Sequence, residues 1–91
     1  MIVKAILSVI GKDRVGIIAR VSGYLQSIGV NIEDISQTIL QDYFAMIMLA
    51  DISAAKIKFD KISSDLEKMG EEMGLSIRLQ HEDIFNAMHR I

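Results

Sequence analysis

The chain has 91 residues, of which 51% are hydrophobic and 5% aromatic, and its formal net charge at pH 7 is -2. This length predicts one domain, and the apolar composition excludes a disordered chain. Without cysteine or a basic stripe, the sequence excludes disulfides and thiol chemistry and lends no electrostatic support to nucleic-acid binding. No apolar run approaches the ~20 residues of a membrane span, and the N-terminal segment does not resemble a signal peptide, so we expect a cytoplasmic protein that does not contact membranes.

The first third of the chain predicts a strand and a helix. Residues 2–10 are β-branched and apolar, with polar side chains on one face only, which is typical of a strand near the middle of a sheet. Apolar residues then recur at helical spacing over residues 14–28, at Ile18, Val21, Leu25 and Ile28. We expect Asp13 to be the N-cap of this helix and Gly29 to end it.

The middle of the chain predicts a hairpin of two different strands. Residues 30–40 are β-branched but rich in polar side chains, as in an edge strand. Residues 43–51 are apolar on both faces, which indicates a strand inside the sheet whose second face is partly covered.

A second helix and a last strand complete the pattern. Ser53 is a candidate cap, Gly74 is expected to end the helix, and its apolar seam consists of Phe59, Ile62, Leu66, Met69 and Met73. Residues 75–82 alternate between apolar and polar and predict a half-buried strand, and residues 83–91 predict one or two helical turns.

The predicted order of elements is β-α-β-β-α-β with a short tail. This is the plan of an α+β, ferredoxin-like sandwich. We therefore expect one domain over residues 1–91, with a four-stranded antiparallel sheet, two helices on one face and a short C-terminal helical tail.

The connection GKDRVGII, residues 11–18, has two interpretations. As a turn, Gly11 could supply a positive φ and Asp13 could cap the helix. As a binding loop, Gly16 would let a ligand or neighbouring chain approach the backbone, and the first helical amides together with Arg14 would attract a carboxylate. Nucleotide binding is not expected, because Ile17 occupies the position where a phosphate-binding loop needs lysine.

The sequence does not predict an enzyme, a metal site or a cofactor. Ser22 falls on the first predicted helix with no histidine placed to activate it. His81 and His89 do not have the spacing of zinc ligands.

The segment GKDRVGIIARVSGYLQSIGVNIEDISQTIL strongly resembles an ACT domain. The shared pattern is a G-x-D-[RK]-x-G-[IL] loop, a helix, and G-x-N-I-x-D at the start of the second strand. The ending HEDIFNAMHRI resembles that of small free-standing ACT proteins of bacteria and archaea. The N-terminal half is similar to the ACT modules of glycine-cleavage repressor proteins.

The resemblance implies a regulatory module that binds an amino acid or related small carboxylate. ACT domains commonly pair side by side, with the ligand between the first loop of one chain and the second-strand region of its neighbour. The implied ligand-binding residues are Gly11, Asp13, Arg14, Gly16, Ile17, Asn31 and Ile32. The expected interface residues are Asp34, Ile35 and Gln37.

Several consequences of this resemblance stay open. The expected assembly is a homodimer or a dimer of dimers. With no catalytic or DNA-binding domain attached, we expect the output to act through a regulated enzyme or regulator protein. The alternative is a ligand-free protein-interaction module with the same dimer.

Overall fold

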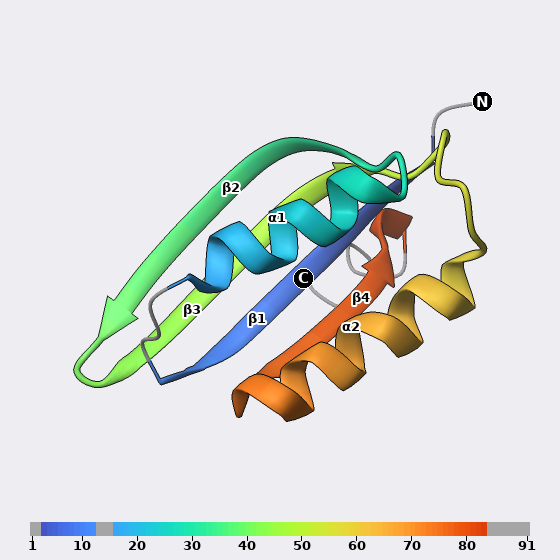
Figure 1. Cartoon of the computed structure of the whole chain (residues 1–91). Helices are drawn as coiled ribbons and strands as arrows, with labels where there is room; N and C mark the ends of the chain where they lie inside the picture. Colours follow the sequence, from blue (N-terminus) through green and yellow to red (C-terminus); the bar gives the residue numbers. More distant parts are fainter. Residues whose placement is uncertain (1–2, 13–15, 84–91) are drawn as a thin grey trace.

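The computed structural model describes residues 3–12 and 16–83, and it confirms the ferredoxin-like plan. The sheet has the order β2-β3-β1-β4, and every neighbouring pair is antiparallel. Both helices lie on the same face of the sheet (Figure 1). The elements are β1 (Lys4–Lys12), α1 (Ile17–Ser27), β2 (Asn31–Leu40), β3 (Tyr43–Asp51), α2 (Phe59–Met73) and β4 (Ser76–His81). The predicted C-terminal helical tail falls largely on residues 84–91, outside the described part of the chain.

The core lies between the sheet and the two helices. β1 and β3 are the inner strands, as their apolar composition predicts, and β2 is an edge strand. Alternate residues of each inner strand face the helices because successive side chains of a strand point to opposite faces. The fully buried large side chains of this layer are Leu7, Val9, Ile17, Val21, Leu25, Met46, Met48, Ile62 and Leu66.

α1 begins later than its sequence pattern predicts. Gly16 is the N-cap, in the left-handed conformation at φ 87°, and Ile17 is the first helical residue. The expected N-cap, Asp13, is therefore wrong, and Asp13 itself lies outside the described residues. The positive φ also belongs to Gly16 and not to Gly11, which pairs with Phe44 inside the β1–β3 ladder.

α2 also begins without the predicted cap. Its N-cap is Lys58 in extended conformation, whereas Ser53 belongs to the turn after β3. The Ser53 hydroxyl accepts a hydrogen bond from the Val3 amide at 2.7 Å, and the Ser53 amide donates to Asp51 Oδ1 at 2.9 Å. The predicted helix ends are confirmed, because Gly29 follows α1 and Gly74 caps α2, both with positive φ.

Two surfaces of the sheet are not covered by the helices. On the face away from them, Tyr43 and Ile47 are 57% and 45% exposed. On the helix-facing side, β2 lies at the margin and curves away from α1 (Figure 1), so that Ile35 and Ile39 are 38% and 60% exposed. Neither helix in the described ranges has the length and apolar character needed to cross a membrane.

Candidate functional site

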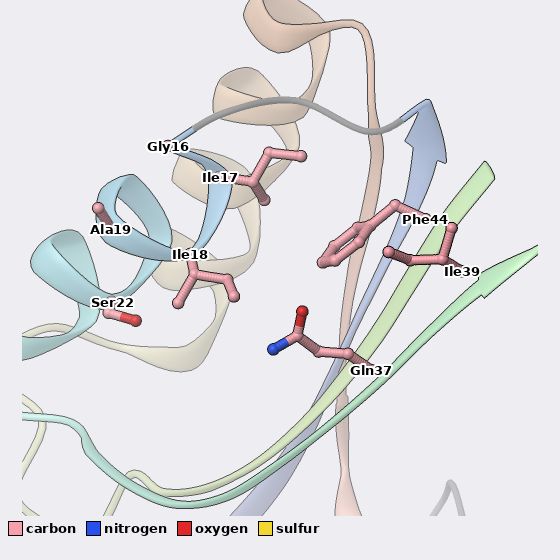
Figure 2. A pocket seen from close by; sticks show the side chains of 8 residues that line it. All are labelled: Gly16, Ile17, Ile18, Ala19, Ser22, Gln37, Ile39 and Phe44. Atoms are coloured by element: carbon pink, nitrogen blue, oxygen red, sulfur yellow. The ribbon is translucent and has the colours of Figure 1, made fainter. Parts of the chain in front are cut away.

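A groove opens between the start of α1 and the helix-facing side of β2, with a volume of about 570 Å³. In Figure 2, Ile18 and Ser22 of α1 lie across this space from Gln37 and Ile39 of β2 and Phe44 of β3. Among the residues that the structure describes, the lining consists of Gly16, Ile17, Ile18, Ala19, Ser22, Gln37, Ile39 and Phe44. The groove is therefore made by three consecutive elements of the chain, α1, β2 and β3.

The helical wall of the groove includes the first turn of α1. The Arg20 amide donates to the Gly16 carbonyl at 3.0 Å, which closes the first helical turn. The amides of Ile17, Ile18 and Ala19 precede this bond, and by helix geometry they have no acceptor within the helix. Gly16 supplies no capping side chain, and a Cβ there would meet nothing within 4 Å. The helix dipole adds partial positive charge, so this end of the groove suits an anionic group.

The strand wall is apolar with one amide side chain. Gln37 pairs with Met46 and Ile39 pairs with Phe44, so both side chains point to the helix face. Gln37 is exposed, and its amide offers both a donor and an acceptor. The strand wall therefore suits a ligand that combines an apolar part with a polar group.

The titratable groups with shifted pKa values lie away from this lining. Lys4 and Glu33 form an ion pair at 2.9 Å on the open face, and the Glu33 carboxylate raises the pKa of Lys4. Hydrogen bonds from Ser53 hold the pKa of Asp51 below its usual range. No ionisable side chain occurs among the eight residues that line the groove. The chemistry of these eight residues is suited to binding through amides and apolar contacts.

The structure brings together only part of the predicted ligand site. Gly16 and Ile17 line the groove, whereas Gly11 lies in β1 beside Leu75. Asn31 and Ile32 begin β2, opposite Asp51 and Ala50. At ~3.4 Å per residue, Asn31 lies roughly 20 Å along β2 from Gln37. A site that includes Asn31 therefore needs a second chain.

The remaining predicted residues are two loop residues of the ligand site and the three expected interface residues. Asp13 and Arg14 lie outside the described residues, so their roles stay predictions. Of the expected interface residues, Asp34 pairs with Leu49 on the open face, whereas Ile35 and Gln37 share the helix face. All three lie on β2, an edge strand of the sheet.

Sequence reasoning missed most of the groove lining. It assigned Gln37 to an interface only and gave no role to Ile39 or Phe44. The alternation of β2 could have grouped Gln37 with Ile39, but a bulge between Ile32 and Asp34 shifts the phase of the strand. Because a shift of one residue sends side chains to the other face, the local pattern did not indicate which β2 residues face α1.

The His81 side chain packs against the aromatic ring of Phe59. Its ring stacks on Phe59, with the ring centroids 4.0 Å apart and the planes 15° apart. Within residues 3–12 and 16–83, no group of three His, Cys, Asp or Glu side chains could hold a metal ion.

Comparisons with known proteins agree on one family. The ACT domain model matches residues 4–80. The UPF0237 proteins of Clostridium acetobutylicum and Methanocaldococcus jannaschii are each 54% identical over 88 residues, which cover 97% of this chain and 99% and 98% of those proteins. The solved ACT domain protein from Streptococcus pneumoniae is 41% identical, with a TM-score of 0.80 and coverage of 96% of this chain and 98% of that one.

A more distant structure shares the fold. A chain assigned as a glycine cleavage system transcriptional repressor is 21% identical, with a TM-score of 0.77. The match covers 89% of this chain and 46% of that one. Since the family model spans most of the sequence and relatives with 54% identity cover nearly all of it, the chain belongs to the ACT domain family.

Proposed function

We propose that this protein is a regulatory module that acts as a homodimer and binds an amino acid or related small carboxylate. The supporting observation is the groove in which the uncapped start of α1 faces the uncharged side chains of β2 and β3. The ACT domain is a regulatory fold, and an effector would bind in this groove.

The groove chemistry matches the parts of an amino acid. The ligand carboxylate would accept hydrogen bonds from the amides of Ile17, Ile18 and Ala19, where the helix dipole favours negative charge. The Gln37 side-chain oxygen would accept from the ligand ammonium. An apolar side chain would pack against Ile39 and Phe44. Asp13 and Arg14, and Asn31 of a second chain, stay predicted contributors.

A thermal-shift screen of the purified protein against the twenty amino acids and common small carboxylates tests this proposal. A ligand at ~100 times its dissociation constant stabilises the folded state by ~2.7 kcal/mol, which for a domain of this size raises the melting temperature by roughly 10–20 °C. We expect Gln37→Ala to reduce this shift. Gln26→Ala is the matched control, because Gln26 is an exposed α1 glutamine outside the groove lining.

The same screen distinguishes the individual predicted contributors. Asp13→Ala and Asn31→Ala should also reduce the shift if those side chains reach the ligand. A flat response of the unmodified protein to every compound would contradict the ligand-binding proposal.

A protein-interaction module with an empty groove is the second candidate. It is favoured by the exposed apolar side chains Tyr43 and Ile47 on the face away from the helices, because such surface suits a protein partner. This candidate predicts no ligand-dependent stabilisation. It also predicts that a regulated enzyme or regulator protein binds the purified dimer, and that Ile47→Lys weakens that binding.

A further inference from the structure

We infer that the C-terminal segment of the chain, residues 84–91, docks on the open face of the sheet and covers the half of that face around Ile6 and Leu49. The open face is the side turned away from α1 and α2 (Figure 1). This surface is separate from the groove, so the inference does not depend on the proposed function.

Ile6 is buried on the open face. Its neighbours in β1, Ala5 and Leu7, have no exposed surface under the helices, and Ile6 points to the opposite face because side chains alternate along a strand. Ile6 is nevertheless only 8% exposed, and the buried cluster under the helices does not include it. Ile10, on the same face of the same strand, is 52% exposed. Ile6 therefore has a cover on its outer side that Ile10 lacks.

The cover extends over three strands at one end of the open face. The residues opposite Ile6 are Leu49 of β3 and Gln80 of β4, and both are half-buried. At the other end of β3, Tyr43 and Ile47 on the same face are exposed. Cross-strand neighbours lie beside one another and shield their flanks, but they do not cover the outer ends of the side chains. The covering group therefore lies over the end of the sheet where β1 begins.

The chain leaves β4 at this covered end. β4 finishes at His81, next to the start of β1, and residues 82–83 begin a helical turn. Lys4 lies on the open face in its ion pair with Glu33. The hydrogen bond and charge of Glu33 raise the pKa of Lys4, and the negative charge of Glu82 raises it further, so Glu82 lies near Lys4. The segment that follows therefore starts beside the covered half of the open face.

The sequence of the segment, IFNAMHRI, suits this docking. Four apolar residues recur at the spacing that gives one side of a helix, namely Ile84, Phe85, Met88 and Ile91. Asn86 falls on the opposite side of the same helix. A helix packed on the sheet through its apolar side would bury these residues against Ile6 and Leu49, and it would keep its polar side in solvent.

The length of the segment matches the extent of the cover. As a helix, residues 84–91 would span about 12 Å. Ile6 and Ile10 are separated by ~14 Å along β1. A helix that starts at the covered end therefore reaches over Ile6 and stops short of Ile10, in agreement with the exposure of the two side chains. Docking leaves a smaller apolar patch of Ile10, Tyr43 and Ile47 for a protein partner.

Cysteine accessibility tests the docking, because the natural chain contains no cysteine. Leu49→Cys places a thiol under the proposed cover, and Ile47→Cys places one outside it on the same strand and face. The measurement is the rate at which N-ethylmaleimide modifies each thiol in the full chain, relative to the rate in the denatured chain. We expect Leu49→Cys to react more slowly than Ile47→Cys.

A second substitution in the segment identifies the covering group. Phe85→Ala should raise the rate in Leu49→Cys at least about ten-fold, because loss of a buried phenylalanine side chain weakens docking by at least that factor. The rate in Ile47→Cys should not change. Asn86→Ala is the matched control, and Phe85→Leu should keep most of the protection because leucine is also apolar. Circular dichroism checks that each variant is folded.

A mixing experiment separates the chain's own segment from that of a second copy. Leu49→Cys chains with a natural C-terminal segment are allowed to exchange subunits with an excess of Phe85→Ala chains. The rate should stay low, because each chain covers its own face. A rise to the unprotected rate would assign the cover to the second copy and overturn the inference. A rate in Leu49→Cys that Phe85→Ala leaves unchanged would overturn it as well, without bearing on the ligand screen.

Discussion

At the scale of single residues, Gly16 links backbone conformation to the site. Gly16 has a left-handed φ and immediately precedes Ile17, the first residue of α1, and both residues line the groove. A serine or aspartate at the N-cap would hydrogen-bond to one of the first helical amides, whereas Gly16 has no side chain to do so. Gly16 is therefore compatible with both interpretations of the GKDRVGII loop, because it has a positive φ and also lines the groove.

Substitutions at Gly16, the N-cap of α1, and at Gly23, inside α1, distinguish the effect of the positive φ from the effect of helix propensity on stability. Gly16→Ala should lower the free energy of unfolding by ~1 kcal/mol, because φ 87° is unfavourable for a residue with a Cβ. Gly23→Ala should raise it by ~0.5–1 kcal/mol, since Gly23 is an exposed interior residue of the helix with nothing within 4 Å of an added Cβ. Urea unfolding measures both. Equal effects of the two substitutions would contradict a special conformation at Gly16.

At the scale of elements, polar side chains join the two helices on their outer surface. The Tyr24 hydroxyl of α1 donates to Asp65 Oδ2 of α2 at 2.6 Å, and Lys61 contacts Asp65 Oδ1 at 2.9 Å. The hydrogen bond from Tyr24 and the nearby Lys61 hold the pKa of Asp65 below its usual value. Burial and the same hydrogen bond raise the pKa of Tyr24. Arg20 and Glu72 form a second contact between the helices at 2.9 Å.

This connection predicts a pH dependence of stability. Because the pKa of Asp65 is lowered in the folded state, its contribution is present above the ordinary aspartate pKa of ~3.9 and is lost as the pH falls through the folded-state value. Tyr24→Phe should therefore be less stable than the natural protein near neutral pH, and the difference should shrink in acid. Thermal unfolding at about pH 7 and about pH 2 measures the difference. Tyr43→Phe, on the open face, is the control, and a pH-independent deficit in Tyr24→Phe would argue against the carboxylate as its cause.

Gly70 shows how closely α2 approaches β4. A Cβ at this buried position would lie 2.8 Å from the Leu75 carbonyl oxygen and 3.1 Å from Ile77 Cγ1. The glycine weakens the helix locally, but it allows this close packing. Its presence follows from the tertiary structure and not from the helical pattern.

At the scale of the whole molecule, the two helices cover one face of the sheet and leave apolar residues on the other. Adjacent residues of β3 test this arrangement, because Met48 is fully buried under the helices and Ile47 is 45% exposed on the open face. Met48→Ala should cost about 2–5 kcal/mol of unfolding free energy through the cavity it creates. Ile47→Ala should cost less than about 1 kcal/mol, since little apolar surface becomes newly exposed. Equal costs in urea unfolding would indicate that the open face is covered in solution.

The sequence predicted the element order, the edge position of β2 and the glycine ends of both helices, because these depend on local periodicity and backbone preference. It misplaced both N-caps. Asp13 and Ser53 have suitable side chains, but the N-caps of the two helices are Gly16 and Lys58. A capping side chain is a local property, whereas the residue at which a helix begins depends on how the preceding loop leaves the sheet.

By itself, the sequence determined the fold class and the core seams, since hydrophobic period is a property of neighbouring residues. Only the tertiary structure decided which side chains share the groove. The bulge before Asp34 sets the phase of β2, and the strand order places Gln37 and Ile39 at the margin of α1. A one-residue change of phase would turn both side chains to the opposite face, and no local pattern specifies that phase.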